Sequence, residues 1–173
     1  MTHAVVPLAF AAAAGRGTIS PKLAAAGAVL AMLPDADVIG FRLGIDYADT
    51  WGHRGATHAL AFSLLVAGVI AAIWREARSI GAYAFLAVAM ASHGLLDALT
   101  NGGLGPALFW PFSDARVFAP VTPIRVSPIG AGFFSARGAA TMASEAVLVW
   151  LPCFALAVAG WLIRNRSRSA LIG

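Results

Sequence analysis

Acidic and imidazole side chains gather in three short clusters of a chain that is otherwise strongly apolar. The clusters read LPDAD at positions 33–37, HRGATH at 53–58 and HGLLD at 93–97. They hold three of the four histidines, and the fourth, His3, lies at the head of an apolar run near the N-terminus. Imidazoles and carboxylates without thiolates suit Zn²⁺, Mn²⁺ or Fe²⁺. The clusters therefore predict a divalent metal centre.

The spacing within two clusters suggests how the histidines are presented. His93 and Asp97 are four apart, so on a helix they share one face and suit either two ligands of one ion or a ligand and its orienting group. A buried His–Asp hydrogen bond that holds helices together is the alternative. His53 and His58 would point about 140° apart on one straight helix. Because Gly55 permits a break, we expect His53 on a loop and His58 in the first turn of the next helix; alternatively, one of the two is structural.

The remaining candidates are two carboxylates and an arginine. Asp35 and Asp37 can converge in a turn, so that one coordinates an ion while the other bridges, orients a histidine or acts as a base. Their alternative role is turn and cap chemistry after Pro34. Arg54 is placed to neutralise negative charge on a phosphate, or is a surface arginine. A metal with an open coordination position would activate water and polarise a phosphoryl or carbonyl oxygen.

Composition indicates what must position these groups. Of the 173 residues, 60% are hydrophobic and 12% are charged, and the mean hydropathy is +0.79. This predicts an all-α, polytopic integral membrane bundle forming a single domain over residues 1–173. The net charge of +4 comes from basic residues at the ends of apolar segments. That placement fits lipid headgroups, so we expect the lipid bilayer as a partner and no direct nucleic-acid binding.

Five apolar segments stand out, at about residues 3–14, 23–40, 57–74, 80–100 and 139–163. The last three reach the length of about 20 residues that a bilayer requires, which gives four to five transmembrane segments in all. The first two are short or broken and are expected to form a tight hairpin. Pro34 predicts that the second helix ends at Leu33, with the acidic pair on the turn beyond. The first segment lacks a preceding basic stretch, so we expect it to be retained and not cleaved as a signal peptide.

Counting crossings brings the candidate residues together. If each segment crosses once, seven basic residues share one side, which the positive-inside rule makes cytoplasmic: Arg16, Lys22, Arg75, Arg78, Arg164, Arg166 and Arg168. The three clusters and His3 then share the other, extracytoplasmic side. The Gly- and Pro-rich connection 101–138 on that side is expected to be a lid or interfacial loop, and 164–173 a basic tail.

The ordered motifs of residues 3–112 resemble a known family. LPDAD, HRGATHAL and SHGLLDALT, followed by FWPF at 109–112, are similar to the YdjM/DUF457 family of inner-membrane proteins, described as membrane-bound metal-dependent hydrolases. That family is thought to be distantly related to zinc-dependent phospholipase C and the S1/P1 nucleases. The resemblance implies metal ligation by His3 and by one or both acidic residues of the first cluster. It also implies ligation by one or both histidines of the second cluster and by His93 with Asp97. Many members carry a histidine after the acidic pair, where this chain has Val38.

The sequence thus predicts a multi-pass inner-membrane hydrolase that uses a divalent metal, zinc before manganese or iron, on a lipid-linked or membrane-proximal phosphoester such as a phospholipid. The expected metal residues are His3, Asp35, Asp37, His53, His58, His93 and Asp97. Asp37 and Arg54 are the expected catalytic residues. The alternatives are a metal transporter or sensor that uses the same ligands, and a non-catalytic membrane protein whose polar clusters only hold the helices together.

Overall fold

The computed structural model describes residues 2–128 and 130–169, and the regular secondary structure of this part of the chain is entirely helical. An isolated bridge joins Thr100 to Ile124. The α-helices are α1 (Val5–Ala14), α2 (Pro21–Leu30), α3 (Leu60–Ile73), α4 (Ile80–Ala98), α5 (Ala136–Glu145) and α6 (Leu151–Ser169). The 3-10 helices are η1 (Thr2–Ala4), η2 (Leu33–Leu43), η3 (Ala56–His58), η4 (Arg75–Ala77) and η5 (Gly130–Phe134), and a π-helix, Ala146–Trp150, joins α5 to α6. The expected all-α membrane bundle is confirmed.

Serine residues fix where two of the long helices begin. Ser20 accepts a hydrogen bond from the backbone N–H of Leu23 at the start of α2, and Ser79 accepts one from Ala82 at the start of α4. Such caps satisfy backbone N–H groups that have no partner inside the helix. Both caps lie at the same end of the bundle, so α2 and α4 run from that end toward the other.

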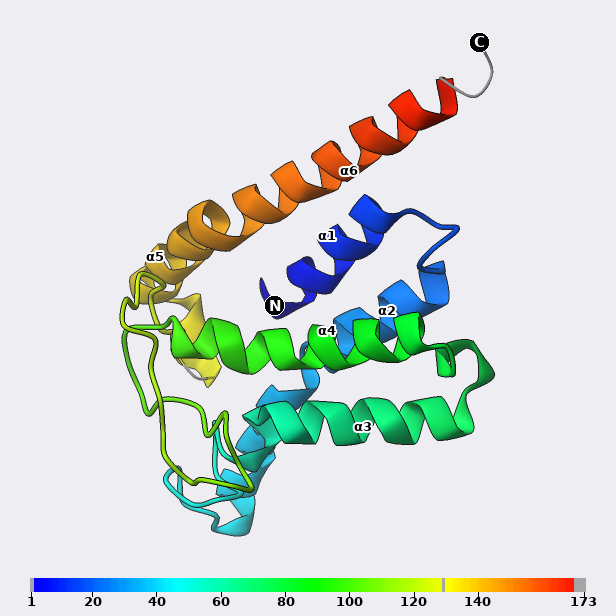
Figure 1. The fold of residues 1–173 in the computed structure, drawn as a ribbon. Helices are drawn as coiled ribbons and strands as arrows, with labels where there is room; N and C mark the ends of the chain where they lie inside the picture. The colour runs from blue at the N-terminus through cyan, green and yellow to red at the C-terminus, as the bar shows by residue number, and fades with distance from the viewer. Residues whose placement is uncertain (1, 129, 170–173) are drawn as a thin grey trace.

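Helix α4 forms the centre of the bundle, packing against α2, α3 and α1, while α6 lies outside it and packs along α1 (Figure 1). Large buried side chains of the core include Phe85, Leu86 and Met90, all from α4. The contact between α1 and α6 is close at Gly160, where a Cβ atom would lie 2.6 Å from the Cα atom of Ala13. The absence of a side chain at Gly160 therefore sets the approach of these two helices.

Three helical stretches are long and apolar enough to cross a membrane: Pro21–Leu43, Ile80–Ala98 and Ala136–Ser167. Two shorter apolar helices, Thr2–Ala14 and Leu60–Ile73, accompany them. The second segment is thus less broken than expected. Its α-helix does end before Pro34, but the acidic pair lies in η2 and not on a turn, because proline is tolerated at the start of a new helix. The third segment is shorter than expected, because the backbone of Ala59 and Trp74 at its ends is extended and not helical.

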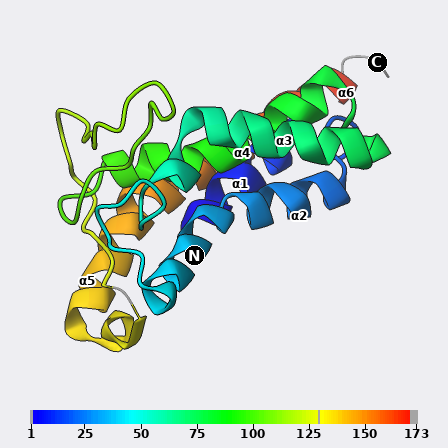
Figure 2. The ribbon, with the colours of Figure 1, turned by 90° about the horizontal axis from the view of Figure 1, so that it is seen from below.

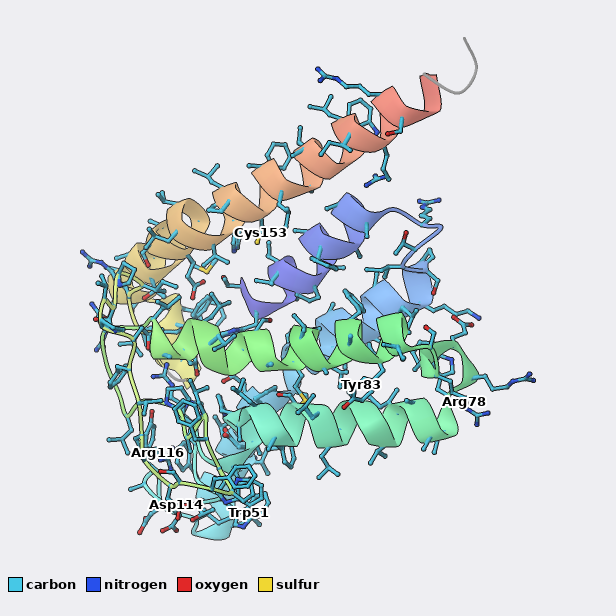
Figure 3. All side chains as sticks on the ribbon, viewed as in Figure 1. Trp51, Arg78, Tyr83, Asp114, Arg116 and Cys153 are labelled. Atoms are coloured by element: carbon cyan, nitrogen blue, oxygen red, sulfur yellow. The ribbon has the colours of Figure 1, made fainter. Side chains whose placement is uncertain are left out.

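The two ends of the bundle differ in character. At one end, Lys22 Nζ lies 3.3 Å from Glu76 Oε1, and the Arg164 guanidinium donates to the carbonyls of Ala12 and Ala13. Figure 3 shows Arg78 at this end, and Trp51, Asp114 and Arg116 at the other. The long connections and α5 also lie at that other end, away from the C-terminus (Figure 2).

The connection 101–138 and the basic tail 164–173 both contain helical structure that was not expected from the sequence. Residues 101–128 are irregular apart from the bridge, whereas 130–138 contain η5 and the start of α5. The first part of the basic tail, residues 164–169, continues α6. Residues 1, 129 and 170–173 lie outside the described part of the chain.

Candidate metal centre

Helix α4 supplies two of the central side chains, His93 and Asp97. His93 is completely buried, and its Nδ1 lies 2.7 Å from the carbonyl oxygen of Ala31, at the end of α2. Because a carbonyl only accepts, Nδ1 carries a proton, and in the neutral imidazole Nε2 then has a free lone pair. That Nε2 has no hydrogen-bond partner although it is buried. Metal-ligating histidines are typically oriented in this way through their second nitrogen.

Asp37 orients two further histidines. Its Oδ1 lies 2.7 Å from Nδ1 of His53, and its Oδ2 lies 3.3 Å from Nδ1 of His58. The same carboxylate accepts hydrogen bonds from the Thr57 hydroxyl and from the backbone N–H of Arg54. Asp37 therefore holds the Nδ1 side of both imidazoles and turns each Nε2 away from itself, toward the centre of the cluster.

The charge around His58 favours a cation. Burial alone would lower the pKa of this imidazole, but the carboxylates of Asp37 and Asp97 on either side outweigh burial and raise its pKa. Asp35 adds a third carboxylate to the cluster, and Arg54 is the guanidinium that faces Asp97, with 3.0 Å between Nε and Oδ2. The carboxylates outnumber this guanidinium, so a divalent ion would neutralise the excess negative charge.

A tight loop presents His53 and Arg54. At Gly52 and Gly55, on either side of them, a Cβ atom would lie 2.1 Å from a backbone carbonyl oxygen, so both positions require glycine. Arg54 itself has a φ of 64°, in the left-handed region that residues other than glycine seldom adopt. The guanidinium of Arg116 donates to the carbonyls of residues 48, 49 and 53 and holds this loop in place.

The ligand atoms converge in three overlapping groups: His3 with Asp35 and His93; Asp35 with His53 and His58; and His58 with His93 and Asp97. Within each group these atoms lie within 4.8 Å of one another. The His93 Nε2–Asp35 Oδ1 and His58 Nε2–Asp97 Oδ2 distances are 3.3 and 3.4 Å. Ligands about 2.1 Å from a tetrahedral ion are separated by about 3.4 Å. The donor set thus fits a divalent metal such as zinc.

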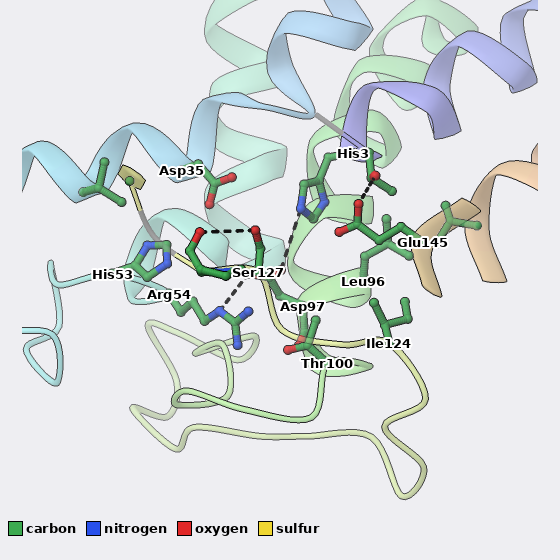
Figure 4. Close-up of a pocket in the computed structure, with 15 residues that line it drawn as sticks. His3, Asp35, His53, Arg54, Leu96, Asp97, Thr100, Ile124, Ser127 and Glu145 are labelled. Carbon is green, nitrogen blue, oxygen red and sulfur yellow. Dashed lines mark hydrogen bonds and ion pairs between the residues drawn. The ribbon is translucent and has the colours of Figure 1, made fainter. Parts of the chain in front are cut away.

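Part of the cluster, namely His3, Asp35, His53 and Asp97, lines an open pocket of about 260 Å³ (Figure 4). The Asp35 side chain is 49% exposed and faces this pocket, while Arg54 and Asp97 contribute buried polar atoms to its wall. Glu145, from the end of α5, lines the opposite side near His3, where it accepts a hydrogen bond from the Thr2 hydroxyl. The pocket therefore gives access to part of the ligand cluster, with the Arg54 guanidinium in its wall paired to Asp97.

The structure brings together six of the seven predicted metal residues: His3, Asp35, His53, His58, His93 and Asp97. Asp37 belongs to none of the three groups and lies behind the histidines that it orients. Arg54 lines the pocket, as does Val38. His58 lies in η3, before α3 begins, and not in the first turn of α3 as expected.

Two contributors were not predicted from the sequence. Thr57 was considered only as a helix start, although its hydroxyl donates to Asp37, and its position beside His58 in the HRGATH motif is the signal that could have indicated this. The carbonyl of Ala31 orients His93 from a distant part of the chain. No sequence pattern reveals such a contact, because any residue type offers a carbonyl.

Comparison with known proteins finds a family and a relative that match most of the chain. A family model described as "YdjM inner membrane protein" matches residues 1–167. "Inner membrane protein YbcI" of Escherichia coli (strain K12) is 43% identical over 156 residues, which cover 88% of this chain and 90% of that protein. No solved structure matches the chain.

Proposed function

Since this chain belongs to the YdjM family of inner membrane proteins, its place is the inner membrane, and we propose that it is a divalent-metal-dependent hydrolase of phosphoesters at the bilayer surface. The observation that carries the proposal is the arrangement of the buried histidines. His58 and His93 each have Nδ1 held by a neighbouring group and a buried Nε2 without a partner, directed at carboxylates on the floor of an open pocket.

The donor set supports two ions at most. His58 and His93 each have one free nitrogen, so neither can serve two ions, although each belongs to two groups. A carboxylate can bridge two ions. The groups His3–Asp35–His93 and Asp35–His53–His58 share Asp35 alone, so both can be filled if Asp35 bridges. The third group, which contains Asp97, instead accommodates a single ion.

The surrounding residues have separate roles in this proposal. A bound divalent metal would supply activated water and polarise a phosphoryl oxygen. Asp35 lies at the pocket floor between the two groups, and Arg54 offers positive charge to the phosphate from the wall. Asp37 positions His53 and His58, so we assign it an orienting role in place of ligation or base catalysis.

The position of the cluster favours hydrolysis over transport. The ligand atoms lie at one end of the bundle beside an open pocket, near the start of η2 and the end of α4. A transport site would be expected near the bilayer midplane, with access from both sides. We place the hydrolytic site on the extracytoplasmic side, opposite the basic end of the bundle.

Hydrolysis by purified protein in detergent tests the proposal. Protein stripped with a chelator and resupplied with zinc or manganese is assayed with bis(p-nitrophenyl) phosphate, p-nitrophenyl phosphate and dispersed phosphatidylglycerol. We expect metal-dependent cleavage that His93→Ala abolishes and that Glu76→Gln, at the opposite end of the bundle, leaves unchanged. Metal-loaded wild type that cleaves none of these probes would overturn the assignment.

A further inference from the structure

A second cavity, an apolar groove of about 630 Å³, runs between α1 and α6. Small side chains form much of its lining, namely Ala9 from α1 and Ala146, Cys153 and Ala157 from the α5–α6 rod. Larger apolar side chains, among them Leu8 and Phe154, complete it. The groove therefore accommodates an apolar group and has no side-chain charge on its walls.

The groove adjoins the polar pocket of the candidate metal centre. Thr2 and Glu145 line the pocket, and Ala146 and Trp150, one and five residues beyond Glu145 along the same helical rod, line the groove. The indole N–H of Trp150 donates to the Thr2 hydroxyl over 3.1 Å, and that hydroxyl donates to Glu145. This hydrogen-bonded trio marks the boundary between the polar and apolar cavities.

The surroundings of the groove are open to the hydrocarbon of the membrane. In the most apolar stretch of Ala136–Ser167, only 6% is buried inside the protein, and the Phe154 side chain is 69% exposed. Figure 1 shows α6 lying along α1 on the outside of the bundle. Trp150 at the boundary is of the residue type that is enriched where hydrocarbon meets headgroups. In an inner membrane protein, such a groove is filled by lipid chains.

We propose that this groove holds an acyl chain of the substrate, so that the substrate is a membrane lipid whose phosphoester headgroup reaches the metal centre from between α1 and α6. This inference rests on the proposed function and identifies its substrate class. The chain extends from the Thr2–Glu145–Trp150 boundary into the hydrocarbon region, and the headgroup occupies the pocket beside Arg54 and Asp35. Binding of the chain in the groove positions the phosphate at the ligand atoms.

Photo-crosslinking tests the groove without requiring catalysis. Full-length protein in detergent micelles receives a small amount of phosphatidylglycerol with a diazirine in one acyl chain, and labelled residues are mapped by mass spectrometry. We expect label on Ala9, Cys153 and Ala157, and much less on the exposed residues Ala155 and Ala159 of α6. Equal labelling around α6 would overturn the inference.

Paired substitutions test whether the groove serves the substrate. Ala157→Phe fills the groove, whereas Ala155→Phe adds the same group to the exposed face of the same helix. We expect Ala157→Phe to lower kcat/KM for phosphatidylglycerol about tenfold, which corresponds to about 1.4 kcal/mol. Its activity on bis(p-nitrophenyl) phosphate, and both activities of Ala155→Phe, should stay unchanged.

The outcomes separate the two proposals. An equal fall on both substrates with Ala157→Phe, or no fall on either, would contradict acyl-chain binding in the groove while leaving the hydrolase intact. If wild type hydrolyses neither substrate, the proposed function fails. The crosslinking pattern then still decides whether the groove binds a lipid chain.

Discussion

At the scale of single residues, the proposed metal centre depends on the Nε2 atoms of two buried histidines, His58 and His93. Leaving a buried polar group unsatisfied costs about 1–3 kcal/mol. His58 and His93 each leave Nε2 unsatisfied within a short distance of carboxylate oxygens. The carboxylate oxygens lie 3.4 Å from His58 Nε2 and 3.3 Å from His93 Nε2, and this arrangement suits ligands that share one ion. A metal ion that accepts both nitrogens and oxygens as ligands accounts for it.

At this scale the sequence identified which residues gather but not how Asp35 and Asp37 divide their roles. The two aspartates lie in a 3-10 helix, where residues two apart are rotated by about 240°. Their side chains therefore point to different sides, Asp35 toward the pocket and Asp37 toward His53 and His58. The sequence did not show that Pro34 begins a 3-10 helix in place of a turn, so convergence of the pair remained open.

Asp37→Asn tests the orienting role. The amide keeps the volume but loses the charge and one acceptor, so His53 and His58 are held less firmly. We expect zinc affinity to fall about 10–100-fold, the range typical of groups that orient metal ligands. The measurement is a competition titration with a zinc-binding dye. Loss of one whole ion, the result expected for His58→Ala, would instead show that Asp37 is itself a ligand.

The close approach of elements around Gly94 determines the site at the scale of secondary structure. A Cβ atom at this position of α4 would lie 2.4 Å from the carbonyl oxygen of His58 in η3. The glycine in the HGLLD motif thus lets His93 and His58 come together, with ring centroids 4.7 Å apart. Spacing in the sequence predicted the shared face of His93 and Asp97. It did not predict this crossing, because the contact of Gly94 is with His58, which is distant in the sequence.

Gly94→Ala tests this crossing. Although alanine is the better helix former, the clash with the His58 carbonyl should force η3 away from α4 and destabilise the protein by about 1–3 kcal/mol. Metal content should fall with it. Thermal unfolding in detergent and elemental analysis give the two readings.

Gly68→Ala in α3 is the matched control for the Gly94 variant. The nearest atom to a Cβ there is Tyr83 Cε2 at 4.0 Å, so alanine fits. We expect the free energy of unfolding to rise by about 0.5–1 kcal/mol from the gain in helix propensity. If both alanine variants behave alike, the crossing at Gly94 is not what holds the histidines together.

At the scale of the whole molecule, the bundle separates a basic end from the end that holds the candidate metal centre. Lys22, Glu76 and Arg164 mark the first, and the pocket floor marks the second. Counting apolar segments predicted this separation. Because successive segments cross the membrane in opposite directions, every second connection between them lies on the same side. The α1–α6 groove was beyond sequence reasoning, since it depends on how closely Gly160 lets α6 approach α1.

Cysteine accessibility tests the orientation of the bundle. Arg78→Cys and Asp114→Cys are made singly in a Cys153→Ser background, because both residues are exposed and lie at opposite ends. A membrane-impermeant maleimide added to spheroplasts should label the cysteine at 114 and not the one at 78, since the basic end faces the cytoplasm. Permeabilised cells should label both. The reverse pattern in intact spheroplasts would place the site on the cytoplasmic side.

Metal content by elemental mass spectrometry decides whether the buried histidines and aspartates bind ions. Wild-type protein, purified in detergent without chelator and resupplied with zinc, should carry about two ions per chain. His58→Ala and His93→Ala should each lose one group of ligands and retain about one ion, while Glu76→Gln should match wild type. About one ion in wild type, lost in both histidine variants, would favour the single group that contains Asp97. Wild type that stays free of metal after resupply would contradict a metal centre altogether.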